Sequence, residues 1–100
     1  MSADRELLEL AAKAAGIKFH SYVDSELFGR GINIGDVDVP LWNPLDDDGD
    51  ALRLAVKLDL LNENPTFLWN LASEMTPGSD PLQATRRAVV LTAAAIGRTV

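Results

Sequence analysis

The sequence predicts one α+β domain over residues 1–100, with three helices packed on a small, mainly antiparallel β-sheet. A chain of 100 residues rarely holds two independent cores. Its composition, 47% apolar and 24% charged, is typical of a globular protein. Segments of helical periodicity alternate with segments of strand periodicity, which favours helices covering a sheet.

The first helix is expected after Ser2, whose hydroxyl suits an N-cap. Leu7, Leu8 and Ala11 recur at helical spacing, and Gly16 is a natural C-terminal stop.

Strands are expected in three places. Residues 17–23 alternate and are rich in aromatic and β-branched side chains. Residues 32–34 and 37–39 flank Gly35-Asp36, which predicts a hairpin with a two-residue turn. Residues 66–71 follow a proline and contain two aromatic residues, which predicts one more strand.

The second helix is expected to begin within residues 46–48, with Asp46 or Asp47 as its cap. Trp42 and Pro44 precede it, and we expect the tryptophan to fill the core beneath the helix. The predicted apolar stripe contains Ala51, Leu54, Ala55, Leu58 and Leu61.

The third helix has the clearest start. Asp80 can cap it, Pro81 suits the first helical position, and Gly97 is expected to end it. Leu82 lies on the predicted buried side. The alanines at 93–95 would allow close approach of a neighbouring element.

Composition excludes several classes of function. Without cysteine there is no disulfide, thiolate catalyst or cysteine-ligated metal. No apolar run approaches the roughly 20 residues that cross a bilayer, and the acidic N-terminus is unlike a signal peptide. The net charge of −6 disfavours direct binding to nucleic acid or to anionic membranes. We therefore expect a cytoplasmic protein.

Catalytic and metal motifs are not recognisable. His20 is the single histidine. Histidine general-base catalysis usually needs an orienting carboxylate and a nucleophile, and no segment near His20 looks like a nucleophile elbow or a glycine-rich turn. A calcium loop with Gly49 as its sixth residue would need ligands at Pro44 and Ala55, which cannot serve. Arg30 lies between two glycines, but no phosphate-loop sequence follows. We expect no catalytic residue, cofactor or metal.

Charge is unevenly spread along the chain. Residues 36–50 contain six acids and no base, whereas residues 81–100 contain three arginines and no acid. These segments either pair within the fold or offer a surface to a partner. The candidate partner-binding residues are Asp46, Asp47, Asp48, Asp50, Trp69, Arg86 and Arg87.

Two segments carry a resemblance. Residues 42–58 read WNPLDDDGDALRLAVKL, residues 84–90 read ATRRAVV, and residues 93–97 read AAAIG. They resemble segments of small uncharacterised proteins of tailed bacteriophages and prophages, of the phage α/β/α-sandwich type. The resemblance implies a phage gene acting in a bacterial cytoplasm. It implies no catalytic residues, and residues 18–39 depart from it.

These observations predict a non-enzymatic phage or prophage accessory protein that binds a host or phage protein. In one version residues 36–50 act as an acidic decoy for a nucleic-acid-binding protein. The alternatives are a homo-oligomeric assembly component, with a homodimer as its simplest form and an apolar patch on the first or third predicted helix, and a small-ligand binder using a pocket near His20 or Arg30.

Overall fold

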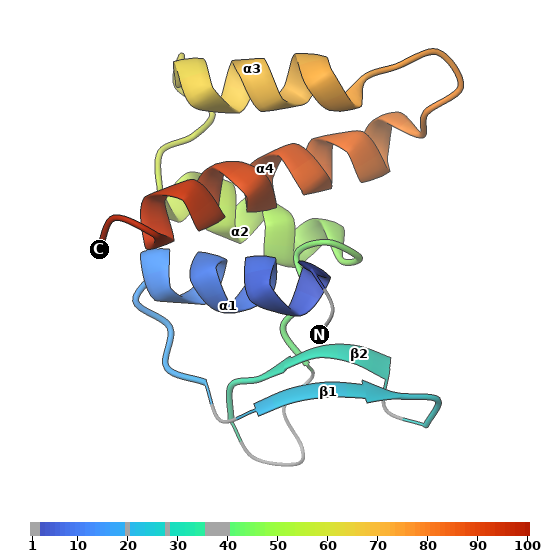
Figure 1. Ribbon diagram of the computed structural model, residues 1–100, viewed down its shortest axis with the longest axis vertical. Helices are drawn as coiled ribbons and strands as arrows, with labels where there is room; N and C mark the ends of the chain where they lie inside the picture. The colour runs from blue at the N-terminus through green and yellow to red at the C-terminus, as the bar shows by residue number, and fades with distance from the viewer. Residues whose placement is uncertain (1–2, 20, 28, 36–40) are drawn as a thin grey trace.

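The computed structural model describes residues 3–19, 21–27, 29–35 and 41–100. The fold is α+β, as predicted, and the described residues form four helices and one two-stranded sheet (Figure 1). The elements in chain order are α1 (Ala3–Ala14), β1 (Ser21–Ser25), β2 (Gly29–Asn33), α2 (Asp48–Lys57), α3 (Pro65–Glu74) and α4 (Pro81–Gly97).

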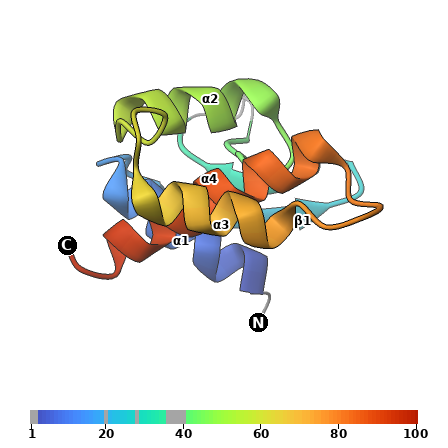
Figure 2. The ribbon, with the colours of Figure 1, turned by 90° about the horizontal axis from the view of Figure 1, so that it is seen from above.

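Helix α4 is the centre of the helical part. It packs against α1 on one side, against α3 on the other, and against α2 (Figures 1 and 2). The β-hairpin lies beyond α1 and contacts it through β2. Helix α3 therefore forms one end of the molecule, the hairpin forms the other, and both depend on the α1–α4 pair between them.

The strand pairing differs from the prediction. β1 pairs antiparallel with β2, from Ser21 opposite Asn33 to Ser25 opposite Gly29. The β1–β2 hairpin therefore turns between Ser25 and Gly29. Within the predicted segment 17–23 the strand begins only at Ser21. The expected partner strand 37–39, Asp36 and His20 lie outside the described residues. Ile32, on β2, instead bridges to Trp42 through reciprocal backbone hydrogen bonds of 2.8 and 2.9 Å.

The prediction of a strand over residues 66–71 is wrong, because this segment lies in helix α3. The side chain of Asn64 accepts a hydrogen bond of 2.9 Å from the Phe67 amide, and Pro65 occupies the first turn. Both features start a helix. Phe67 and Leu71, four residues apart, lie against the core, so the apolar spacing that matters here is helical.

The predicted starts of α2 and α4 are confirmed, but α2 ends at Lys57, before Leu58 and Leu61 of its predicted stripe. The predicted cap Ser2 lies outside the described residues. Asp47 caps α2, and Asp80 caps α4 with Pro81 in its first turn. Gly16 ends the first helical segment with a positive φ of 71°, a conformation that glycine adopts without strain. Three predicted core positions are wrong: Leu61 is 55% exposed beyond the end of α2, Leu82 is 60% exposed in the first turn of α4, and Ala95, in the alanine run of α4, is exposed.

The hydrophobic core lies where α4 crosses α1. Small side chains line this crossing, and Leu8 and Val90 are fully buried beside it. Gly97 ends α4, but the residue after it keeps a right-handed helical conformation, so no left-handed cap is formed. The reason for glycine is steric, since a Cβ atom at Gly97 would overlap the carbonyl oxygen of Leu10 on α1.

Replacing Gly97 with alanine is expected to destabilise the protein by at least about 2 kcal/mol, because the obstacle is backbone and cannot rotate away. Urea unfolding measures this change. The matched control is Gly49→Ala in α2, where the added methyl meets only side-chain ends of Arg53 and Asp47. The control should be neutral or stabilising by up to about 1 kcal/mol. Equal effects of the two substitutions would contradict the close crossing.

Candidate functional site

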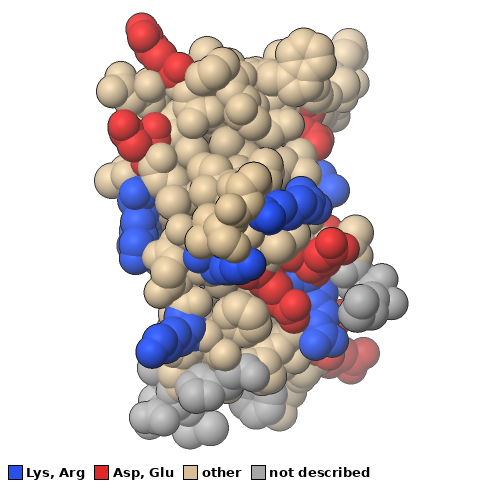
Figure 3. Space-filling view, turned by 60° about the vertical axis from the view of Figure 1, so that its left-hand side comes forward, with Lys and Arg blue, Asp and Glu red and all other residues tan. Residues whose placement is uncertain are grey.

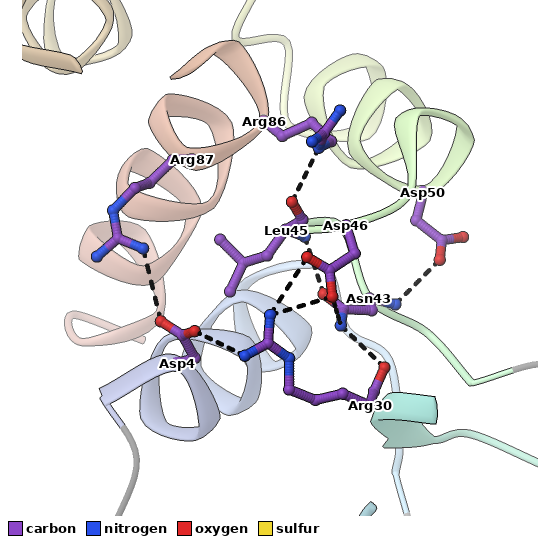
Figure 4. A network of polar contacts seen from close by, with 8 residues as sticks. All are labelled: Asp4, Arg30, Asn43, Leu45, Asp46, Asp50, Arg86 and Arg87. Atoms are coloured by element: carbon purple, nitrogen blue, oxygen red, sulfur yellow. Dashed lines mark hydrogen bonds and ion pairs between the residues drawn. The ribbon is translucent and has the colours of Figure 1, made fainter. Parts of the chain in front are cut away.

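The four predicted aspartates lie together at the start of α2, where the chain arrives from Trp42. Figure 4 shows two of them, Asp46 and Asp50, with their neighbours. Asp47 is the N-cap, and its carboxylate accepts a 2.7 Å hydrogen bond from the Asp50 amide. Asp50 accepts a 3.0 Å bond from the Asn43 amide and a 2.7 Å bond from the Arg53 guanidinium. Both carboxylates thus stabilise the first turn of the helix and the segment before it.

Asn43 is the buried centre of this segment, with 4% of its surface exposed. Its side-chain amide donates to the carbonyl of Arg30 at 2.8 Å and to Asp46 at 3.0 Å. Its side-chain oxygen accepts from the Leu45 amide at 3.0 Å. Its backbone carbonyl accepts from the amides of Asp46 and Asp47. Every polar group of Asn43 is therefore paired, and together the pairs fix the turn that leads into α2.

Arg30, on β2, joins two other parts of the chain. Its guanidinium contacts Asp46 at 3.1 Å and Asp4 of α1 at 3.2 Å. The hydrogen bond that Arg30 donates to Asp46 raises the pKa of Arg30 further above its ordinary value, so this side chain stays charged. The charge of Arg30 is therefore balanced by carboxylates of the same chain.

The two arginines of α4 also pair with acidic groups of the chain. Arg86 donates to the Leu45 carbonyl at 2.8 Å and to Asp48 at 2.6 Å. Arg87 lies 3.5 Å from Asp4 and 3.4 Å from Glu74. The acidic segment and the arginine-rich last helix are thus neighbours. We call the set of Arg30, Asn43, Asp46, Asp47, Asp48, Asp50 and Arg86 the aspartate clamp.

The carboxylates of the aspartate clamp are all engaged within the chain. Each of its four carboxylates already accepts a hydrogen bond or contacts an arginine. Among the residues that the structure describes, no three metal-ligating side chains are grouped to hold an ion. The contacts that these residues make are those of a structural network joining β2, α1, α2 and α4.

Trp42 is buried in the core, as expected, and Pro44 is also buried. Trp42 is 6% exposed and is held by its backbone bridge to Ile32. Gly31, beside this bridge, has a φ of 152°, and a Cβ atom there would approach the Trp42 carbonyl oxygen to 2.8 Å. The glycine therefore lets the chain at Trp42 lie directly against β2.

Trp69 lies apart from the aspartate clamp, on the outer side of α3, and is 75% exposed. Leu68, Ala72 and Met75 are exposed beside it at helical spacing. We call Leu68, Trp69, Ala72 and Met75 the α3 face. Sequence reasoning identified Trp69 but missed the rest of this face, because it assigned the segment to a strand. The signal that would have found it is Asn64-Pro65, a helix cap followed by a first-turn proline.

A groove of about 550 Å³ opens between helix α2 and the chain segments that follow α1 and β2. Its walls are mainly apolar and include Trp42 and Leu54. Of the charged groups at its rim, Arg53 contacts both Asp47 and Asp50. The described residues lining it do not include Arg30, which the small-ligand alternative had singled out, and His20 lies outside the described part.

Comparison with known proteins finds no matching family model, no matching curated protein and no matching solved structure. The helices of the described residues include none with the length and apolar character to cross a membrane.

Replacing Asn43 with alanine is expected to reduce the free energy of unfolding by about 2–3 kcal/mol, since the Arg30 carbonyl and the Leu45 amide lose their partner in a buried place. Thermal or urea unfolding measures the loss. The exposed Asn62→Ala serves as control and should stay within about 0.5 kcal/mol of the parent protein. An Asn43→Ala protein as stable as its parent would show that the clamp does not hold the fold.

Proposed function

We propose that this protein is an accessory protein of phage or prophage origin, which acts in the bacterial cytoplasm without catalysis, by binding another protein through the α3 face. One observation carries the proposal. Helix α3 is the most hydrophobic of the four helices on average, yet Phe67 is its only buried residue. An apolar helix face left in water is typical of an interaction surface.

The shape of the molecule supports this choice. Helix α3 packs chiefly on α4, so its outer side is covered by no other element of the described chain (Figure 2). Trp69 lies at the middle of that side. Buried tryptophans are frequent hot spots of protein interfaces, where their removal costs about 2 kcal/mol or more.

The acidic-decoy version of the function has less support. A decoy needs carboxylates that are free to receive a basic partner. Asp46, Asp48 and Asp50 each contact an arginine of the same chain, and Asp47 caps a helix. We therefore propose the α3 face, and not the aspartate clamp, as the contact surface.

A pull-down with the tagged protein tests this proposal, from host cells that also produce an untagged copy of the chain. We expect a stoichiometric partner to be captured by the parent protein and lost with Trp69→Gln. The matched control is Leu27→Gln, since Leu27 is 82% exposed at the hairpin turn, far from α3 in Figure 1. Its capture should equal that of the parent.

Two results would contradict the proposal. One is equal capture by the parent and by Trp69→Gln. The other is a partner that persists with Trp69→Gln but is lost at high salt, or when Asp46, Asp47 and Asp48 become asparagine, which would favour the acidic decoy.

A further inference from the structure

We infer that the occupant of the α3 face is a second copy of this chain, bound by the same face around a two-fold axis. This inference rests on the proposed function, because it names the partner of the surface proposed there. The argument uses the charge of the α3 face, its shape and its size.

The α3 face is uncharged on an acidic molecule. The whole chain has a net charge of −6, but α3 contains a single charged residue, Glu74. Glu74 lies 3.4 Å from Arg87 of α4, so its charge is balanced within the molecule. Figure 3 shows uncharged atoms over much of the upper end of the molecule, where α3 lies, with some Asp or Glu side chains at its edges and the Lys and Arg side chains lower down.

The absence of charge on the α3 face indicates the kind of partner that it binds. A basic or acidic protein surface finds no opposite charge on the α3 face, so the face favours an uncharged, apolar partner. Two copies of an acidic protein repel each other through their charged sides, but the α3 face brings no like charges together. A second copy offers an apolar surface of this kind, and a two-fold arrangement sets the same patch on both sides of the interface.

The shape of the face fits such a pairing. Trp69 is the largest side chain of the face, and Ala72, three residues later on the same side, is the smallest. Two α3 helices lying antiparallel can place the indole of each copy over the alanine of the other. This arrangement buries both tryptophans and lets the helices approach closely at the alanines.

The size of the α3 face indicates how strongly two copies associate. A helix of ten residues is only about 15 Å long. Stable specific complexes bury roughly 800 Å² on each partner, which is more than one short helix supplies. The association is therefore a weak and reversible dimer, and monomer and dimer coexist at micromolar concentrations or above.

Analytical ultracentrifugation of the purified full chain, from low micromolar to near-millimolar concentration, tests the inference. The apparent mass of the parent is expected to rise from monomer toward dimer. Trp69→Gln is expected to raise the dissociation constant at least tenfold, whereas Leu27→Gln leaves it unchanged. Circular dichroism confirms that each variant is folded. Indole emission should shift to the blue as the parent dimerises, because Trp69 leaves water while Trp42 is already buried.

A parent protein that stays monomeric over the whole range would overturn the inference. A dimer that is indifferent to Trp69→Gln would also overturn it, since the contact would then lie elsewhere. Neither result removes the proposed function if another protein is still captured in a Trp69-dependent manner. The proposed function fails separately, when neither capture nor self-association depends on Trp69.

Discussion

The packing of this protein depends on satisfying one buried amide. Asn43 lies in the interior between β2 and α2, where an unpaired polar group would cost about 1–3 kcal/mol. Its partners come from three places in the chain: the carbonyl of Arg30, the side chains of Asp46 and Asp50, and the turn at Leu45. All of these hydrogen bonds form together only when the hairpin, the turn and the start of α2 lie in one relative position.

The acidic run follows from this constraint. Asp46 holds Arg30, which also contacts Asp4, and so the hairpin is joined to α1. Asp48 forms an ion pair with Arg86, so the same segment is joined to α4. Exposed ion pairs contribute little one by one, about 0–1 kcal/mol each. Their role here is to orient elements around a buried network, and the local concentration of acid needs no partner to explain it. The α3 face has no such internal role, which is why we place binding there.

Local features of the fold were predictable from the sequence, and distant contacts were not. Caps such as Asp47 and Asp80 act over three or four residues, so the sequence alone predicts them. The helix at residues 65–74 was missed because aromatic residues after a proline also suit a strand, and the cap at Asn64 was not weighed. The contact of Arg86 with Leu45 spans 41 positions, and no spacing rule reaches so far. For the same reason the charge pattern along the sequence could not decide whether the acidic residues pair with the arginines of the chain or face a partner. That choice follows from the placement of the helices around α4.

The central claim is that the aspartate clamp holds the fold together while α3 lies at its edge. Native-state amide hydrogen exchange at low protein concentration, where the chain is monomeric, tests this most directly. We predict that the amides of Asn43, Leu45 and Asp50, which donate to clamp side chains, exchange only with global unfolding. The amides of α3 are predicted to exchange through local opening of lower free energy. Rapid exchange at the three clamp amides, with α3 protected as strongly as α4, would contradict the account.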